Sequence, residues 1–228
     1  MGHHVDRLTI AEQVYLLQCN PAKRKLNDRA VVAPRLIRAG VLADLALNRL
    51  IEDRNGRVSV IDGGAPQDAV SAFVLARMYA SKPRKWKDWI QRDQRPTVDR
   101  LEDHLEDRDL VSVNHKRILW VFPTREVVVH DTSVIDALRK DVRDVAFGVE
   151  PVDQIEPERA VLTAIVASAE MRSVISRQEA KMAKGRIAEL LGESGPIGPA
   201  LRKAIRETQT SIAVAGSSAA VIGSVTSS

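Results

Sequence analysis

Apolar residues recur at helical spacing along most of the chain. Thr9 and Glu12 have the spacing of a capping box and precede the apolar run 14–17, which predicts a helix over 10–18 that stops at Asn20-Pro21. The run 36–47 is apolar over most of a helix surface, which is typical of a buried helix. The same spacing predicts further helices over 67–80, 86–90, from Pro96 to about 110, and over 135–145, 161–174, 177–191 and 199–212.

Two β-hairpins interrupt this helical pattern. Asn55-Gly56 stands between the strand-like runs 50–53 and 58–62, and both central residues of such a turn favour positive φ. A second hairpin is predicted within 110–129, with arms at 117–122 and 126–129 and a turn at 123–125. We therefore expect a mostly α fold, a single compact domain with a buried helical core, surrounding amphipathic helices and two small β-hairpins. Residues 1–4 and 213–228 are predicted to be flexible ends of a domain spanning 5–212.

The composition and the missing motifs mainly exclude classes of protein and kinds of site. Hydrophobic residues make up 44% and charged residues 28% of the 228 positions, which is ordinary for a soluble globular protein. The single cysteine, Cys19, excludes a disulfide framework and a cysteine-based zinc cluster. Phosphate-binding loops, dinucleotide glycine patterns and nucleophile elbows are missing, so we expect no enzyme activity, no cofactor and no metal. Neither a signal peptide nor an apolar membrane span is found, so we expect a cytoplasmic protein.

Charge is segregated along the chain, although the formal net charge is only +4. Residues 21–40 carry six basic side chains and one acidic one, and residues 82–100 carry seven and three, whereas residues 101–110 have a net charge of −4. The acidic residues between 102 and 107 are interpreted as a solvated helix face. Arg outnumbers Lys 24 to 10, and the guanidinium fork matches phosphate oxygens. The two basic segments predict either a surface for phosphate-bearing partners or a solvated face without a ligand.

Four stretches, in order, resemble the Golgi phosphoprotein 3 family and in particular its bacterial relatives. They are LTIAE at 8–12, RAGVLADLAL at 38–47, KPRKWKDWI at 82–90, and LEDRDLV at 105–111 followed by ILWVFP at 118–123. Together they extend the resemblance over residues 5 to about 205. The resemblance implies a compact helical protein without enzyme activity that binds phosphatidylinositol 4-phosphate in a shallow basic pocket on a membrane.

The resemblance also implies a set of head-group residues. By position, Arg38 and Arg95 match two of the family's arginines, whereas Val98 stands at a third and Arg29 at the family's tryptophan. The expected head-group contacts are therefore Arg38, Arg95, Arg29 and the nearby Arg100. Lys85 and Lys87 would add longer-range attraction. The expected partner is an anionic phospholipid or a phosphoinositide.

The second hairpin carries an apolar run on both of its faces. Side chains alternate between the faces of a strand, so Leu119 and Val121 share one face while Trp120 and Phe122 share the other. The exposed face of such a hairpin needs a partner. We expect Leu119, Trp120, Val121 and Phe122 to contact a membrane, a second subunit of a homo-oligomer, or a neighbouring helix.

Two other functions stay open from the sequence. Helices followed by hairpins resemble winged helices, whose basic segments bind nucleic acid. Nucleic-acid binding is disfavoured because no predicted helix combines a basic stripe with base-reading residues, and the helix over 97–110 is acidic. A scaffold that captures short tails of other proteins, without lipid binding, is the second alternative.

Overall fold

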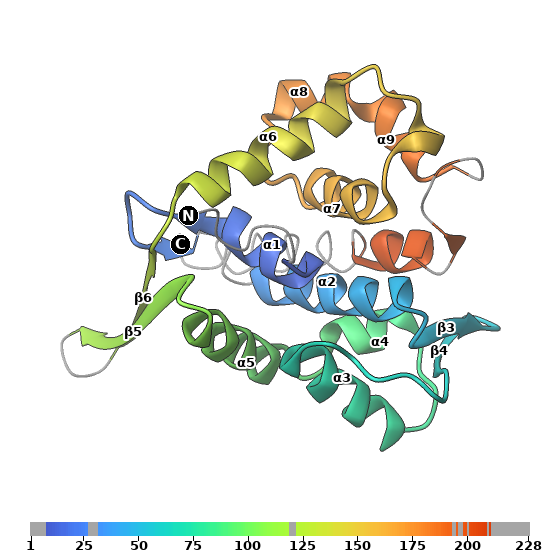
Figure 1. Ribbon diagram of the computed structural model, residues 1–228, viewed down its shortest axis with the longest axis horizontal. Coiled ribbons are helices and arrows are strands. Elements are labelled where there is room, and N and C mark those ends of the chain that lie inside the picture. The colour runs from blue at the N-terminus through green and yellow to red at the C-terminus, as the bar shows by residue number, and fades with distance from the viewer. Residues whose placement is uncertain are drawn as a thin grey trace, which may run out of the picture.

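The computed structural model describes residues 8–26, 32–118, 122–192, 195, 198–199, 201–208 and 210. Two helices, α1 (Ile10–Gln18) and α2 (Ala33–Leu47), pack against each other at the centre of the molecule (Figure 1). On one side of this pair lie α3 (Ala69–Tyr79), α4 (Trp86–Gln91) and α5 (Gln94–Asp107). On the other side lie α6 (Ser133–Phe147), the short 3₁₀ helix η2 (Val152–Gln154), α7 (Pro157–Ser168), α8 (Arg177–Met182) and α9 (Lys184–Leu190). The predicted mostly α fold with a buried helical core is confirmed.

Helix α1 begins at the predicted capping box. Thr9 Oγ1 accepts a hydrogen bond from Glu12 N (3.2 Å), and Glu12 Oε2 accepts one from Thr9 N (2.7 Å). Asp44 of α2 adds a cap from outside the helix, since its two carboxyl oxygens accept from Ile10 N (2.9 Å) and Ala11 N (3.1 Å). The local sequence therefore determines where α1 begins, and Asp44 of α2 adds further hydrogen bonds to its first turn.

Gly40 allows α1 and α2 to lie close together. A Cβ atom at this position would stand 2.8 Å from Ala11 Cα and 3.0 Å from Ala11 N, closer than side chains and backbone normally approach. The sequence pattern predicted that α2 is buried. The need for a glycine at its contact with α1 is visible only in the fold.

The first predicted hairpin is confirmed. It consists of β3 (Ile51–Arg54) and β4 (Arg57–Val60), joined by Asn55 and Gly56 at φ 52° and 83°. Both turn residues have the positive φ that the Asn-Gly pair predicts.

The second hairpin is longer than predicted, and its turn lies elsewhere. β5 (Val111–Ile118) pairs with β6 (Phe122–Val129), and Pro123 faces Arg117 within the ladder. The predicted turn at 123–125 is therefore wrong. Proline is accommodated because Val127 N donates away from β5, so the nitrogen of Pro123, four residues earlier in the same strand, also faces the outer edge of β6 and no N–H donor to β5 is needed there.

A third hairpin, which the sequence did not predict, occupies the first basic segment. β1 (Cys19–Asn20) pairs with β2 (Lys25–Leu26) around Arg24, whose φ is 47°. Val127 N donates to Arg24 O (2.9 Å) and so attaches this hairpin to β6. Two-residue strands carry too little alternation to be recognised from sequence.

The C-terminal helices follow the predicted pattern with shifted boundaries. α7 starts at Pro157, earlier than predicted, and ends at Ser168, two residues before Glu170 with its positive φ. The helix predicted over 177–191 is divided at Ala183 into α8 and α9. Residues 201–208 are helical, within the helix predicted over 199–212. None of the described helices is both long and apolar enough to cross a bilayer.

Candidate functional site

Arg38 lies in the middle of α2 and joins three helices. Its side chain is completely buried, with 0% of the residue exposed. Nε and Nη2 donate to Trp89 O in α4 (3.1 and 2.8 Å), and Nη1 donates to Thr97 Oγ1 in α5 (3.2 Å). Burial lowers the pKa of Arg38 to about 10, which still leaves the guanidinium charged at neutral pH.

The junction between α4 and α5 is built around this buried guanidinium. Asp93 precedes α5 with a left-handed backbone (φ 49°) and offers no side-chain cap to the helix. Instead, Thr97 Oγ1 donates to Asp93 O (2.7 Å) while it accepts from Arg38. The Asp93 carboxylate is also the nearby negative charge that opposes the fall in the Arg38 pKa. Arg38, Asp93 and Thr97 together fix how α5 begins.

Arg95 lies on the surface of the same junction. It is exposed in the first turn of α5, two residues before Thr97. Lys85, Lys87 and Arg92, at or next to α4, are exposed as well. We call Lys85, Lys87, Arg92 and Arg95 the α4–α5 basic surface. The start of a 14-residue helix also presents backbone N–H groups and the positive end of its dipole, both favourable to an anion.

The fold thus brings Arg38 and Arg95 to the same junction, but Arg38 is buried there and Arg95 is exposed. Arg95 can reach a ligand from solvent, whereas the Arg38 guanidinium lies beneath the surface with three of its N–H groups occupied. The burial of Arg38 follows from its position among apolar residues of α2, a signal already present in the sequence. Arg92, which the sequence analysis counted only as part of a basic segment, belongs to this surface.

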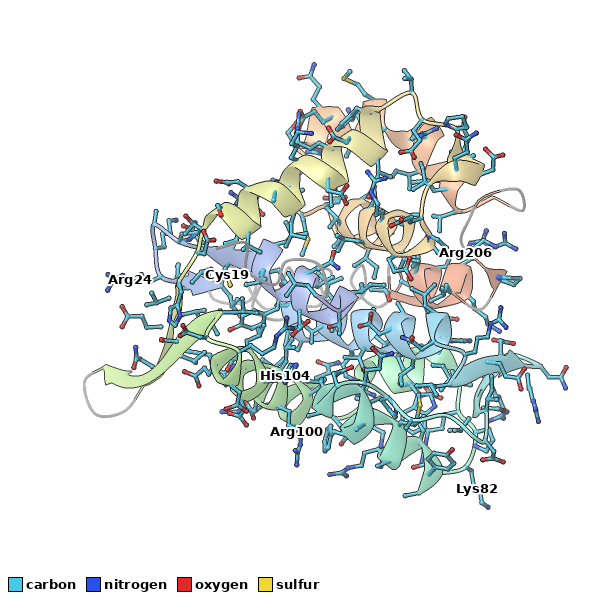
Figure 2. The ribbon with its side chains drawn as sticks, viewed as in Figure 1. Cys19, Arg24, Lys82, Arg100, His104 and Arg206 are labelled. Atoms are coloured by element: carbon cyan, nitrogen blue, oxygen red, sulfur yellow. The ribbon has the colours of Figure 1, made fainter. Side chains whose placement is uncertain are left out.

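Arg100 has a different environment from Arg95. It is exposed on α5 (Figure 2). Its guanidinium carbon lies 4.6 Å from the centroid of the Phe73 ring on α3. Arg77 of α3 stacks on the same ring at 5.1 Å. Two guanidinium groups therefore contact one aromatic ring, a favourable arrangement for cations of this kind. The spacing of Phe73 and Arg77 fits one helix face, but the approach of α5 could not be read from sequence.

Other predicted contact residues fall outside the described part of the structure. Arg29 lies in the segment 27–31, and Leu119, Trp120 and Val121 lie between β5 and β6, in neither case among the described residues. Phe122 is the first residue of β6, where the backbone is described and the side chain is not.

The acidic cluster at 102–107 is only partly the solvated face that we predicted. Glu102 is buried, accepting from Tyr15 Oη (2.8 Å) and Arg125 Nη1 (3.1 Å). Burial raises its pKa to about 7, against the opposing effect of Arg125. Asp103 and Asp107 are exposed as predicted. The helix pattern could not reveal Arg125, which arrives from β6. The described residues contain no group of three or more His, Cys, Asp or Glu side chains arranged to hold a metal ion.

Comparison with known proteins gives one match that covers most of the chain. The model of the Golgi phosphoprotein 3 family (GPP34) matches residues 10–208. A search of curated proteins finds no match. The matched region includes α1 to α9, both basic segments and the whole α4–α5 basic surface.

Proposed function

Because this chain belongs to the Golgi phosphoprotein 3 family, we propose that it is a non-enzymatic peripheral membrane protein that binds anionic lipid head groups. The observation that best supports this proposal is the α4–α5 basic surface, with its four exposed cations beside a helix start. Phosphorylated head groups are the favoured class, and phosphatidylinositol 4-phosphate is the one that the family resemblance implies. The proposed location is the cytoplasmic side of a membrane.

The charges of this surface suit a reversible membrane attachment. A basic side chain near an anionic membrane contributes about 1 kcal/mol, and salt screens that attraction over about 8–10 Å. Four cations are enough for a measurable affinity without an inserted anchor. Arg95 has the most direct role, since a phosphate that meets its guanidinium also meets the N-terminal end of α5.

In this proposal, Arg38 supports the basic surface from the protein interior and does not touch the lipid. Its hydrogen bonds to Trp89 O and Thr97 Oγ1 hold α4 and α5 in place, so it positions Arg95 and contributes long-range positive charge. Its loss would weaken lipid binding by disturbing the junction. Arg29, Arg100 and the lysines are assigned supporting attraction.

The β5–β6 hairpin is the second proposed contact. Its strands extend beyond the helices in Figure 1, and Leu119, Trp120 and Val121 stand in sequence between Ile118 and Phe122, the pair at its end. An apolar run there would favour shallow insertion between lipids or contact with a second subunit.

The proposal is tested with vesicle flotation of the full chain and of Arg95→Ala. The vesicles are phosphatidylcholine alone, phosphatidylcholine with phosphatidylserine, and phosphatidylcholine with phosphatidylinositol 4-phosphate at matched charge. We expect wild-type protein to bind both anionic vesicles and Arg95→Ala to bind about fivefold more weakly, the equivalent of about 1 kcal/mol.

Arg177→Ala is the matched control. Arg177 is an exposed arginine of α8, on the opposite side of the molecule, and its removal changes the net charge equally (Figure 1). Binding should fall by less than twofold in this variant. Equal losses in the two variants, or no wild-type binding to either anionic vesicle, would contradict the proposal.

A further inference from the structure

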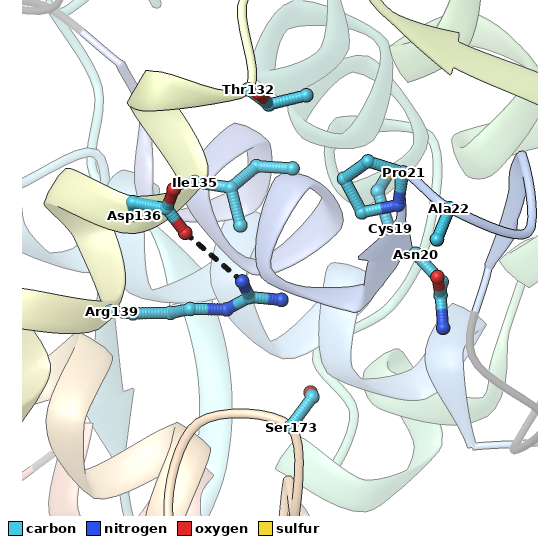
Figure 3. A pocket seen from close by; sticks show the side chains of 9 residues that line it. All are labelled: Cys19, Asn20, Pro21, Ala22, Thr132, Ile135, Asp136, Arg139 and Ser173. Atoms are coloured by element: carbon cyan, nitrogen blue, oxygen red, sulfur yellow. Dashed lines mark hydrogen bonds and ion pairs between the residues drawn. The ribbon is translucent and has the colours of Figure 1, made fainter.

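A cavity on the other side of the molecule has chemistry of its own. It measures about 360 Å³ and lies between the end of α1, the first turns of α6 and the segment that follows α7 (Figure 3). Its volume is within the usual range for small-molecule sites, about 300–1,000 Å³. The residues that line it include none of the α4–α5 basic surface.

Arg139 of α6 is the cation of this cavity. Its guanidinium extends from α6 toward the Asn20–Ala22 turn, with Ser173 below it in this view (Figure 3). Nη1 donates to Asp136 Oδ1 (3.1 Å), one turn earlier on the same helix. Among the described residues, Nε is buried without a hydrogen-bond partner, and no hydrogen bond from Nη2 is found. A guanidinium usually binds a carboxylate through two parallel N–H groups, and this one uses a single nitrogen.

The ion pair with Asp136 is easily exchanged. The Asp136 side chain is 75% exposed, and the Arg139 side chain is 29% exposed. Pairs of this kind on one helix contribute about 0.3–0.5 kcal/mol, because water screens them. An incoming anion therefore displaces Asp136 at little expense in free energy and gains the Nη1 and Nη2 donors of Arg139.

The other residues that line the cavity indicate which chemical groups a ligand would need besides an anion. Pro21 and Ala22 give the cavity an apolar side, and the buried side chains of Ile135 and Cys19 lie beneath it. The Cys19 thiol donates to Tyr15 O at 3.5 Å, and burial raises its pKa to about 12, so no charge lies beneath this side at physiological pH. Asn20 is held by a hydrogen bond from Lys23 N to its Oδ1 (3.1 Å). The cavity thus combines one cation with an apolar wall and a few polar groups at its rim.

We propose that this cavity binds a carboxylate group carried on a short apolar body, with Arg139 as its cation. The charges of the lining favour a monoanion, since a single carboxylate replaces Asp136 one for one, whereas a phosphate dianion would face one cation and the carboxylate of Asp136. The apolar body lies against Pro21 and Ala22. Either a free short-chain acid or the carboxyl terminus of a peptide has this chemistry.

The test is a titration of the ¹⁵N-labelled full chain, followed through backbone amide shifts, with 4-methylpentanoate and with its uncharged amide. We expect saturable shifts at Asn20 and Ser173 with the acid, in the millimolar range, and at least tenfold weaker binding of the amide. A short peptide that ends in leucine, tested with a free and with an amidated carboxyl terminus, identifies the source. Saturable binding of either carboxylate supports the proposal, and binding of neither overturns it.

Three variants locate the binding. Arg139→Gln should weaken binding of the acid at least tenfold, and Asp136→Asn should strengthen it, because the competing carboxylate is gone. Ser173→Leu, which leaves the guanidinium intact, should block the cavity and abolish binding. Arg177→Gln removes an exposed arginine that is not among the residues lining the cavity, and this variant should bind as the wild type does. Wild-type affinity in Arg139→Gln, or equal affinity for acid and amide, overturns the proposal, and thermal unfolding of each variant verifies that it is folded.

Discussion

At the scale of single residues, Arg38 shows that position in a motif and exposure are separate properties. The resemblance pointed to a phosphate contact, whereas the structure directs its guanidinium to Trp89 O and Thr97 Oγ1. A buried arginine with its donors satisfied stabilises the packing of its neighbours, and its loss leaves their acceptors unpaired.

Arg38→Ala should therefore lower stability strongly. We expect the free energy of unfolding to fall by about 3–5 kcal/mol, because a charged donor is lost, its acceptors remain buried and a cavity opens. Urea denaturation measures this change. Arg177→Ala, a surface substitution, should change stability by less than about 0.5 kcal/mol. A stable Arg38→Ala protein would contradict the role given to the hydrogen bonds.

The sequence shows how many basic residues there are and where they stand, but it does not show which of them are buried and which are exposed. Arg95 and Arg38 were both recognised as candidates, and only the packing of α4 and α5 on α2 separates the exposed one from the buried one. Glu102 was misjudged for the same reason, since its partners Tyr15 and Arg125 come from distant segments. Long-range partners leave no periodic signal in the segment that receives them.

At the scale of elements, α1 and α2 depend on close contact at Gly40. Alanine is the better helix former by about 1 kcal/mol, so propensity alone predicts that Gly40→Ala stabilises the protein. Its Cβ would, however, stand 2.8 Å from Ala11 Cα, a backbone atom that cannot move aside without shifting α1.

We expect Gly40→Ala to reduce the free energy of unfolding by about 1–3 kcal/mol, because overpacking outweighs propensity. The control is Gly185→Ala in α9, where an added Cβ would meet nothing within 4 Å. That variant should be as stable as the wild type or more stable by about 0.5–1 kcal/mol. Chemical denaturation of the pair distinguishes a steric effect from a helix-propensity effect, and a stabilised Gly40→Ala protein would show that the helices can separate freely.

Elements with a strong local signal were predicted well. The capping box placed the start of α1, and Asn55-Gly56 placed the β3–β4 turn. The β5–β6 turn was misplaced because Pro123 looks like a turn residue but lies in an open-edged strand. The division between α8 and α9 was missed because Ala183 carries no helix-breaking signal.

At the scale of the whole molecule, two buried carboxyl groups couple folding to pH. Burial raises the pKa of Asp44 to about 8 and that of Glu102 to about 7, although each accepts hydrogen bonds. Both groups hold their proton more tightly in the folded state than in the unfolded chain, where the pKa is about 4. The stability they provide is present in full below pH 4 and is lost as the pH rises toward 7 and 8.

The free energy of unfolding should therefore fall between pH 5 and pH 8, by up to about 1.4 kcal/mol per pH unit for each proton. Urea titrations at several pH values measure the slope, and Asp44→Asn should reduce it. Glu179→Gln is the control, because Arg143 holds the pKa of that half-buried carboxyl at about 2, below this window. A wild-type stability that is flat or rises over this range, or an unchanged slope in Asp44→Asn, would contradict the assignment.

The cap that Asp44 provides has a consequence for the order in which the chain acquires its structure. Asp44 stands 34 positions after Ile10 and 33 after Ala11, so the hydrogen bonds that secure the first turn of α1 close a long loop. During synthesis, α1 leaves the ribosome well before its cap. Until α2 emerges and docks, the capping box is the only one of the two caps available to this nine-residue helix, which would be marginal by itself in water. The beginning of the helix reaches its native hydrogen bonding only after residue 44 has been made.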